Sequence, residues 1–214
     1  MKFVEKGYKA IIKKTMGGLT TQWQGKTIEW GGTWPKVDYA KLFKEKTGLD
    51  VLEVSLHDLL AAGEKLSAKV WLEMGRGRMI DAIYKKAVRP TLIQPCFLIN
   101  HPLELSPLAK RSAKNGRIVD RIQVVACASE IGNGFSELND PVDQRVRFEE
   151  QMRLREAGNN EAQQMDEEFV EALEYGMPPA AGFGLSERMF AILMDKPVRE
   201  AVVFPLMKPR VSKN

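Results

Sequence analysis

Three strand-like segments follow one another after Arg89 and Pro90, and this grouping limits the possible folds more than any other feature of the chain. They cover residues 91–100, 121–128 and 130–138, and the polar residues 110–116 are expected to form an exposed loop between the first two. Strands grouped in one part of a chain, with helices before and after them, are typical of α+β domains. We therefore expect one α+β domain over residues 1–214, with an antiparallel sheet flanked by helices.

Helical segments are predicted on both sides of these strands from the spacing of apolar residues and from capping residues. Asp and Ser often begin helices, and Gly and Asn often end them. The expected helices cover residues 1–16, 38–47, 55–62, 67–88, 143–157, 166–175 and 186–195, with stops at Gly17, Gly48, Gly63, Gly158 to Asn160, and Gly176. Residues 21–24 and 26–30 are expected to pair as a hairpin, and residues 178–184 to form a short strand.

The 214 residues are 44% hydrophobic and 28% charged, which is the composition of an ordinary globular domain. The net charge of +4 permits a nucleic-acid partner without arguing for one. Cys96 and Cys127 have no close Cys or His neighbours, so we interpret them as buried, reduced thiols. The sequence has no run of about 18 apolar residues, and its start is too polar for a signal peptide, so we expect a cytoplasmic protein without a membrane segment.

The segment from Glu130 to Glu137 carries the most chemical information. If it is extended, Asn133, Phe135 and Glu137 share one face, which places an amide, an aromatic ring and a carboxylate on a single wall. Such a wall suits an ammonium ligand, because the carboxylate neutralises the cation and the ring covers methylene groups. Glu130 has the opposite parity and joins this face only if the backbone bulges, for which the intervening glycines offer the freedom. The alternative is an edge strand with solvated polar residues.

A second candidate site lies at residues 182–188. Ser186 is a natural N-cap, which puts Arg188 in the first helical turn, where the helix dipole disfavours a cation. A bound anion would explain this position, because free N–H groups at a helix start, a guanidinium and nearby glycines together make a phosphate site. The alternative is an ion pair between Arg188 and Glu187 or another carboxylate.

Other polar groups receive no chemical role. His101 lies between an asparagine and a proline, and we interpret it as a hydrogen-bonded structural residue. His57 is expected at the surface. The helix predicted at residues 143–157 alternates basic and acidic residues, which is typical of a solvated face, and its arginines are Arg145, Arg147, Arg153 and Arg155.

Three strings of residues are more specific than these patterns. The first is Pro-Thr-Leu-Ile-Gln-Pro at 90–95 running into His-Pro-Leu-Glu-Leu-Ser-Pro-Leu-Ala-Lys at 101–110. The second is Glu130 followed by Asn-Gly-Phe-Ser-Glu-Leu-Asn-Asp at 133–140, and the third is Gly-Met-Pro-Pro-Ala-Ala-Gly-Phe-Gly at 176–184 before Glu187 and Arg188. In order and spacing they resemble the class II lysyl-tRNA synthetase family, and flanking matches extend the likeness over nearly the whole chain.

The resemblance implies a class II synthetase-like antiparallel sheet and a lysine–tRNA ligase, which adenylates lysine with ATP and transfers it to tRNA(Lys). In that family the residue matching Glu137 binds the side-chain ammonium of lysine, and those matching Asn133 and Phe135 line the same pocket. The residue matching Glu130 holds Mg²⁺ on ATP, and the one matching Arg188 grips the γ-phosphate of ATP. The implied catalysis works by charge neutralisation and alignment.

The chain departs from the family pattern in three places. The first and second class-defining motifs have no counterpart, and residues 1–16 resemble the segment just after the second motif. The resemblance therefore implies a sheet incomplete at its N-terminal side, an upstream part of the synthetase, and a possible homodimer in the complete enzyme. Gln123 stands where many members have a second metal-binding glutamate, and its amide brings no charge. The motif before Arg188 is one residue shorter than the common form.

Three functions stay open at this point. The first is a fragment of a lysine–tRNA ligase whose activity alone is absent or very weak. The second is a non-catalytic, synthetase-derived module that binds a protein or a nucleic acid. The third is a paralogue that lysylates a protein side chain, for which the pocket residues would look alike.

Overall fold

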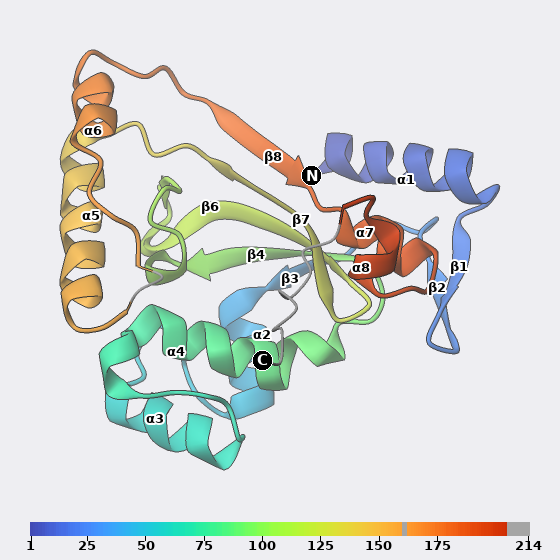
Figure 1. The fold of residues 1–214 in the computed structure, drawn as a ribbon, viewed down its shortest axis with the longest axis horizontal. Coiled ribbons are helices and arrows are strands. Elements are labelled where there is room, and N and C mark those ends of the chain that lie inside the picture. Colours follow the sequence, from blue (N-terminus) through green and yellow to red (C-terminus); the bar gives the residue numbers. More distant parts are fainter. Residues whose placement is uncertain (160–161, 205–214) are drawn as a thin grey trace, which may run out of the picture.

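A six-stranded sheet forms the centre of the computed structural model, which describes residues 1–159 and 162–204 (Figure 1). The strand order is β3-β4-β6-β7-β8, and β5 pairs with β6. The strands are β3 (Lys36–Asp38), β4 (Cys96–Pro102), β5 (Arg111–Ser112), β6 (Asn115–Ala126), β7 (Ser129–Ser136) and β8 (Ala181–Leu185). The described pairs are antiparallel except β3 and β4, which run parallel. The predicted α+β fold is confirmed, and β3 is an addition that the sequence did not predict.

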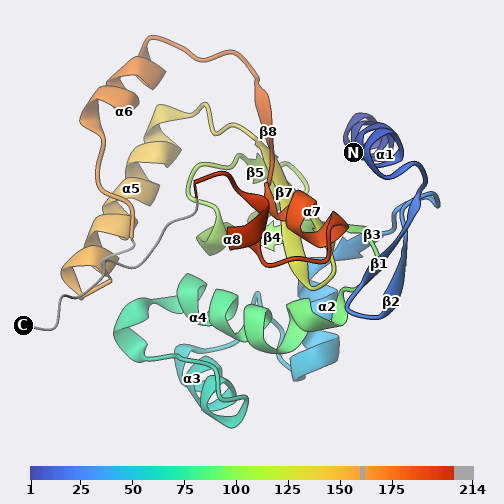
Figure 2. The same ribbon diagram turned by 45° about the vertical axis from the view of Figure 1, so that its right-hand side comes forward.

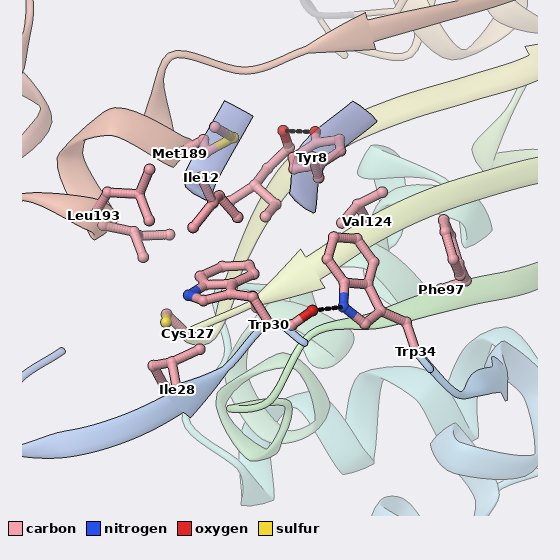
Figure 3. Close-up of a cluster of buried hydrophobic side chains, with 13 residues drawn as sticks. Tyr8, Ile12, Ile28, Trp30, Trp34, Phe97, Val124, Cys127, Met189 and Leu193 are labelled. Carbon is pink, nitrogen blue, oxygen red and sulfur yellow. Dashed lines mark hydrogen bonds between the residues drawn. The ribbon is translucent and has the colours of Figure 1, made fainter. Parts of the chain in front are cut away.

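One face of the sheet packs against α1 (Lys2–Met16), the hairpin of β1 (Thr20–Trp23) and β2 (Lys26–Glu29), and α7 (Arg188–Leu193). The shared core is an aromatic cluster, shown in Figure 3, whose fully buried members include Tyr8, Ile12, Trp30, Phe97, Val124 and Met189. Two hydrogen bonds cross it: Trp34 Nε1 donates to the Trp30 carbonyl at 3.1 Å, and the Tyr8 hydroxyl donates to the Ile131 carbonyl at 2.5 Å. The cluster therefore fastens α1 directly to β7.

The opposite face packs against α2 (Tyr39–Thr47), α3 (Leu56–Lys65) and α4 (Arg76–Ile83), below the sheet in Figure 2. Their common core includes Phe43, Leu59, Ile80, Leu98 and Val125. α5 (Pro141–Glu156) and α6 (Glu167–Glu174) pair at one end of the sheet, and α8 (Val198–Ala201) follows α7. The polar residues of β6 and β7 that share this face therefore point into the space between the sheet, α4 and α5.

Most helix boundaries follow from local capping. The side chains of Asp38 and Ser55 accept hydrogen bonds from backbone N–H groups in the first turns of α2 and α3, as predicted. Gly17 and Gly48 end α1 and α2 with φ angles of 76° and 78°, a left-handed conformation that costs glycine little. Asp140 caps α5 in the same way as Asp38 caps α2.

The predicted helix over residues 67–88 is wrong in its first half. Ser67 has a φ of 53° and Gly75 a φ of 81°, so the backbone is not helical at either residue. A single 3-10 turn covers Leu72–Met74, the α-helix begins at Arg76, and it continues as a π-helix over Tyr84–Val88 before a 3-10 turn at Arg89–Thr91. Apolar spacing alone did not reveal this break.

Smaller differences concern helix ends and one loop. α3 runs through the expected stop at Gly63 and ends at Lys65. The predicted loop at 110–116 holds β5 and the start of β6, and α7 begins two residues after Ser186, whose Oγ still accepts from the Arg188 N–H at 3.3 Å. Asn160, part of an expected helix stop, lies outside the described residues.

Two remaining expectations concern the thiols and membrane segments. Cys96 and Cys127 are buried and unpaired with each other, and burial raises the pKa of each thiol to about 12. This confirms the interpretation of buried thiols. Among residues 1–159 and 162–204, no helix combines the length and the apolar character needed to cross a membrane.

Candidate functional site

A β-bulge in β7 brings Glu130 onto the same face as Asn133. Val124 of β6 faces Gly132, whereas the next residue, Val125, faces Glu130, so Ile131 is the extra residue on β7. If residues 130–133 alternated regularly, without the bulge, Glu130 would lie on the aromatic-cluster face. The bulge that Glu130 needs in order to share a face with Asn133 is therefore present in the backbone.

A chain of hydrogen bonds runs across this wall. Gln123 Nε2 donates to Glu130 Oε2 at 2.6 Å, and Gln123 Oε1 lies 3.1 Å from His101 Nε2. Beside it, Arg121 Nε donates to Asn133 Oδ1 at 2.7 Å. The wall thus presents one carboxylate and two amides whose orientations are fixed by neighbours.

His101 reaches this wall because of a second irregularity. The β4–β6 register shifts between Ile99 and His101, and the intervening Asn100 has a φ of 59°. The imidazole is buried, which lowers the pKa of His101 to about 3, and the nearby Arg121 guanidinium acts in the same direction. His101 is therefore a neutral, hydrogen-bonded residue, in line with the prediction that it is structural.

The wall forms part of a cavity of about 640 Å³. Its sides come from α4, the π-helix, α5 between Val146 and Leu154, and residues 101–107 at the end of β4 and beyond it. Polar residues dominate the lining and include Tyr39, Tyr84, Arg89, Arg121, Gln123 and Glu130. The predicted residues Gln123 and Glu130 are thus at a cavity large enough for a nucleotide-sized ligand.

An ion-pair network holds α5 against this cavity. Arg147 donates to both carboxylate oxygens of Asp143 and to the carbonyls of Ser106 and Ala109, and Arg111 contacts the same carboxylate. Partial burial alone would raise the pKa of Asp143, but the hydrogen bonds from Arg147 and Arg111 hold it well below its usual range. The interpretation of Arg147 as part of a solvated face is wrong, because its side chain is only 7% exposed.

The expected lysine-binding residues lie farther along β7. Asn133 pairs with Gly184 and Phe135 with Gly182. On the face that carries the side chains of Asn133 and Phe135, β8 therefore presents glycines, which have no side chain. Phe135 lines a smaller hollow of about 210 Å³ next to Arg121. A Cβ added at Gly182 would meet Oε1 of Glu137 at 3.2 Å, so the half-buried Glu137 also turns to this side. Neither Asn133 nor Glu137 lines the larger cavity.

Arg188 stands apart from these residues. It is exposed at the start of α7, next to Met189, which is buried in the aromatic cluster. Its guanidinium makes no ion pair or hydrogen bond with any described residue, and it lines neither cavity. The structure thus brings Gln123, Glu130 and Asn133 to one wall but does not bring Arg188 to it, and the role of Arg188 stays a prediction.

Several residues of the site were not predicted. Arg121 was within reach of sequence reasoning, because it lies two positions before Gln123 on the same strand and so shares its face. Tyr39, Tyr84 and Arg89 come from separate elements, and no spacing in the sequence connects them.

The described residues do not form a metal centre on their own. No group of three or more His, Cys, Asp or Glu side chains among them is placed to share an ion. Gln123 turns its amino group, not its oxygen, toward Glu130. A single carboxylate still fits Mg²⁺ carried on nucleotide phosphates, because that ion takes one or two protein carboxylates and keeps waters.

Comparison with known proteins identifies relatives over nearly the whole chain. The family model for tRNA synthetases class II (D, K and N) matches residues 1–208. The lysine–tRNA ligase of Roseiflexus castenholzii is 44% identical over 213 residues, which are 98% of this chain and 44% of that protein. Those of Thermotoga maritima and Staphylococcus saprophyticus are 41% and 38% identical, over 94% and 98% of this chain and 40% and 43% of theirs.

The chain therefore spans less than half the length of the curated relatives it matches. The family match covers almost all of it, and the identities lie well above the level at which unrelated chains align. The chain belongs to the family of class II tRNA synthetases (D, K and N).

Proposed function

We propose that this chain provides the lysine pocket and part of the ATP site of a lysine–tRNA ligase. The observation that carries the proposal is the wall on β7, where a bulge aligns Glu130 with Asn133 and Phe135. Relatives that are 37–44% identical are named lysine–tRNA ligases, which supports the choice of lysine. An ATP-dependent ligase of this kind joins the carboxylate of lysine to the AMP part of ATP with release of pyrophosphate. It then transfers the lysyl group to the 3′-terminal hydroxyl of tRNA(Lys) with release of AMP.

The lysine side chain would lie along Asn133, Phe135 and Glu137. The backbone N–H of Glu137 donates to the Ala180 carbonyl, but its carboxylate makes no hydrogen bond or ion pair with a described residue and is available to an ammonium group. The ring of Phe135 would cover methylene groups, and Gly182 leaves space opposite it. Charge complementarity at a partly buried carboxylate discriminates strongly for a cationic side chain.

ATP would use Glu130 and Arg188. Glu130 would hold Mg²⁺ that arrives on the nucleotide, and the ion would neutralise phosphate charge there. Gln123 would orient Glu130 through its hydrogen bond rather than act as a ligand in the conformation seen. The unpaired guanidinium of Arg188 is suited to the γ-phosphate. These assignments follow the family resemblance.

The complete activity would need further protein segments. We propose that an upstream part of the synthetase supplies the remaining contacts to ATP and lysine, and that the complete enzyme is a homodimer. The 214 residues alone would then show little or no activity. This agrees with a match to about two fifths of the length of the relatives.

A chimera tests the proposal. The 214 residues would replace the matching segment of the Roseiflexus castenholzii lysine–tRNA ligase, and lysine-dependent exchange of pyrophosphate into ATP would be measured. We expect exchange in the chimera. Glu137→Gln should raise the KM for lysine by at least tenfold and leave the KM for ATP unchanged, because the ammonium loses its counter-charge. Glu149→Gln, at an exposed residue of α5, is the matched control.

An unchanged lysine KM in Glu137→Gln would remove this residue from the pocket. Exchange dependent on another amino acid would overturn the choice of lysine. An acceptor assay with tRNA(Lys) and with a lysine-bearing protein then separates tRNA ligation from protein lysylation.

A further inference from the structure

The carbonyl of Ile131, the extra residue in β7, receives two donors from other parts of the chain. The Tyr8 hydroxyl of α1 donates to it at 2.5 Å, and the backbone N–H of Ser186 donates to it at 3.0 Å. A carbonyl oxygen has two lone pairs, so these two donors use its full capacity. Ile131 is buried, which shields both contacts from water. The bulge is therefore tied to α1 and also to the residue that follows β8.

Tyr8 is held so that its hydroxyl points to this carbonyl. The side chain is 1% exposed in the aromatic cluster, and its ring packs edge-on against Trp34 and Phe183, with centroids 5.6 and 6.2 Å away (Figure 3). A Cβ at Gly132 would lie 2.2 Å from the hydroxyl oxygen, so this oxygen fills the space of the missing side chain. Burial and, to a smaller extent, the charge of Glu130 raise the pKa of Tyr8, so the hydroxyl stays protonated and donates.

The position of the bulge decides where the carboxylate of Glu130 lies. Ile131 faces the aromatic cluster, whereas Glu130 faces the wall and accepts from Gln123. Gly132 follows directly and restricts the backbone little, so the bulge could move along β7 if the Ile131 carbonyl were free. A move by one residue toward the N-terminus would pair Ile131 with Val125 and make Glu130 the extra residue. The Tyr8 hydrogen bond thus favours the register in which Glu130 lies beside Gln123.

The same carbonyl also fixes the start of α7. Ser186, whose N–H it accepts, receives the N–H of Arg188 through its Oγ at 3.3 Å. The Ser186 carbonyl accepts from the N–H of Met189 at 3.0 Å, and Met189 is buried in the same cluster as Tyr8. The two ends of the expected ATP site, which do not touch each other, are thus connected through one buried oxygen.

We propose that Tyr8 is a positioning residue for the part of the site that takes nucleotide phosphate. By holding the Ile131 carbonyl, it sets the Glu130 carboxylate and, through the start of α7, Arg188. This inference rests on the proposed function, which assigns these two residues to ATP and Glu137 to lysine. Tyr8 lies on the opposite face of the sheet, so it acts through the strand and not by contact with a substrate. Its loss should therefore impair the use of ATP and leave lysine binding intact.

The first measurement needs no ligand. The side-chain amide of Gln123 donates to Glu130, so its signals in a nitrogen–proton correlation spectrum of the 214-residue chain report where that carboxylate lies. Tyr8→Phe keeps the ring and removes the hydroxyl, and we expect the Gln123 signals to shift toward those of solvent-exposed glutamine side chains. Ile12→Val is the matched control, because it shortens a fully buried side chain one turn along α1 and leaves the Ile131 carbonyl untouched. There the Gln123 signals should stay in place.

The second measurement uses the chimera with the Roseiflexus castenholzii enzyme. Tyr8→Phe should raise the KM for ATP about fivefold and leave the KM for lysine unchanged. Ile12→Val should change neither value at a temperature well below both melting midpoints. Gly132→Ala reaches the same contact from β7, because its Cβ would take the place of the Tyr8 hydroxyl, and it should reproduce both effects of Tyr8→Phe.

The outcomes separate positioning from stability. Unmoved Gln123 signals in Tyr8→Phe, or an unchanged KM for ATP, would overturn the proposal. Equal effects in Ile12→Val would also overturn it and leave Tyr8 a role in core stability alone. If Tyr8→Phe does not fold, Gly132→Ala decides on the same criteria. A chimera that is inactive with its original residues, while Gln123 signals shift only in Tyr8→Phe, would remove the proposed function and keep the tie between Tyr8 and Glu130.

Discussion

Gln123 donates from Nε2 to Oε2 of Glu130 across 2.6 Å, and this bond joins two strands at the floor of the large cavity. The amide neutralises no charge, yet it satisfies one carboxylate oxygen and is itself held by His101. The orientation of Glu130 therefore depends on a residue that adds no negative charge to the wall.

Gln123→Glu would place a second carboxylate beside Glu130. Repulsion between the two should raise the pKa of the pair above the value of about 4.3 for an unfolded glutamate. A carboxyl whose folded pKa is raised destabilises the fold once the pH exceeds the unfolded value. We expect the variant to lose about 2 kcal/mol of unfolding free energy between pH 4 and pH 8 relative to the original chain, measured by urea denaturation.

Millimolar Mg²⁺ should restore most of that loss, because the variant has two carboxylates to share one ion. Gln22→Glu, on the exposed side of β1, is the control and should show neither effect. A flat pH dependence in Gln123→Glu would show that the two side chains separate freely.

Tyr8→Phe should destabilise the chain by about 1–3 kcal/mol. The Tyr8 hydroxyl is buried and donates to the Ile131 carbonyl at 2.5 Å, so its removal takes one of two donors from that carbonyl. Tyr39→Phe removes an equally buried hydroxyl that has no partner among the described residues, and it should cost less than about 0.5 kcal/mol. Urea midpoints at constant m-value give both numbers, and equal losses would contradict the assigned contacts.

Gly132→Ala should disturb the junction of α1 and β8. A Cβ there would lie 2.2 Å from the Tyr8 hydroxyl oxygen and 2.6 Å from Phe183 Cζ, and overpacking of this kind costs about 1–3 kcal/mol. Gly7→Ala, within α1 and with no atom near its Cβ, should instead stabilise the chain by about 1 kcal/mol. Thermal unfolding of the two variants should therefore shift in opposite directions.

Asp143→Asn should cost about 3 kcal/mol at pH 7, because it leaves the buried Arg147 guanidinium without its counter-charge. The pKa of Asp143 is lowered in the fold, so its contribution is present above the unfolded value near 3.8 and is lost as the pH falls toward the folded value. The difference between variant and original chain should shrink below about pH 4. A difference independent of pH would point to packing instead of charge.

Local signals predicted much of the fold. Asp38, Ser55, Gly17 and Gly48 act within one helical turn, so their effect is independent of distant contacts, and the structure agrees at each. The prediction of a helix before Arg76 was wrong because tertiary contacts decide the conformation there. A Cβ at Gly75 would lie 2.5 Å from Leu154 of α5. No local pattern reports such a contact.

In the candidate site, too, local patterns predicted one part, and tertiary contacts decide the other. Parity predicted the wall of Asn133 and Phe135, and the need for a bulge at Glu130 followed from the same rule. The meeting of Tyr39 and Tyr84 at the large cavity could not be predicted, because these residues come together only after α2 and the π-helix pack against each other. No sequence pattern shows that their hydroxyls lack hydrogen-bond partners, because this depends on the surrounding atoms of the folded chain.

The extra residue in β7 has a consequence for any attempt to shorten or transplant this strand. Straightening the bulge with Ile131 retained would restore strict alternation and turn the carboxylate of Glu130 in among Tyr8 and Trp30, where a lone negative charge is poorly solvated. The one inserted residue thus keeps the Glu130 carboxylate and the apolar core on opposite faces of β7. The strand can be moved to another scaffold only together with its bulge.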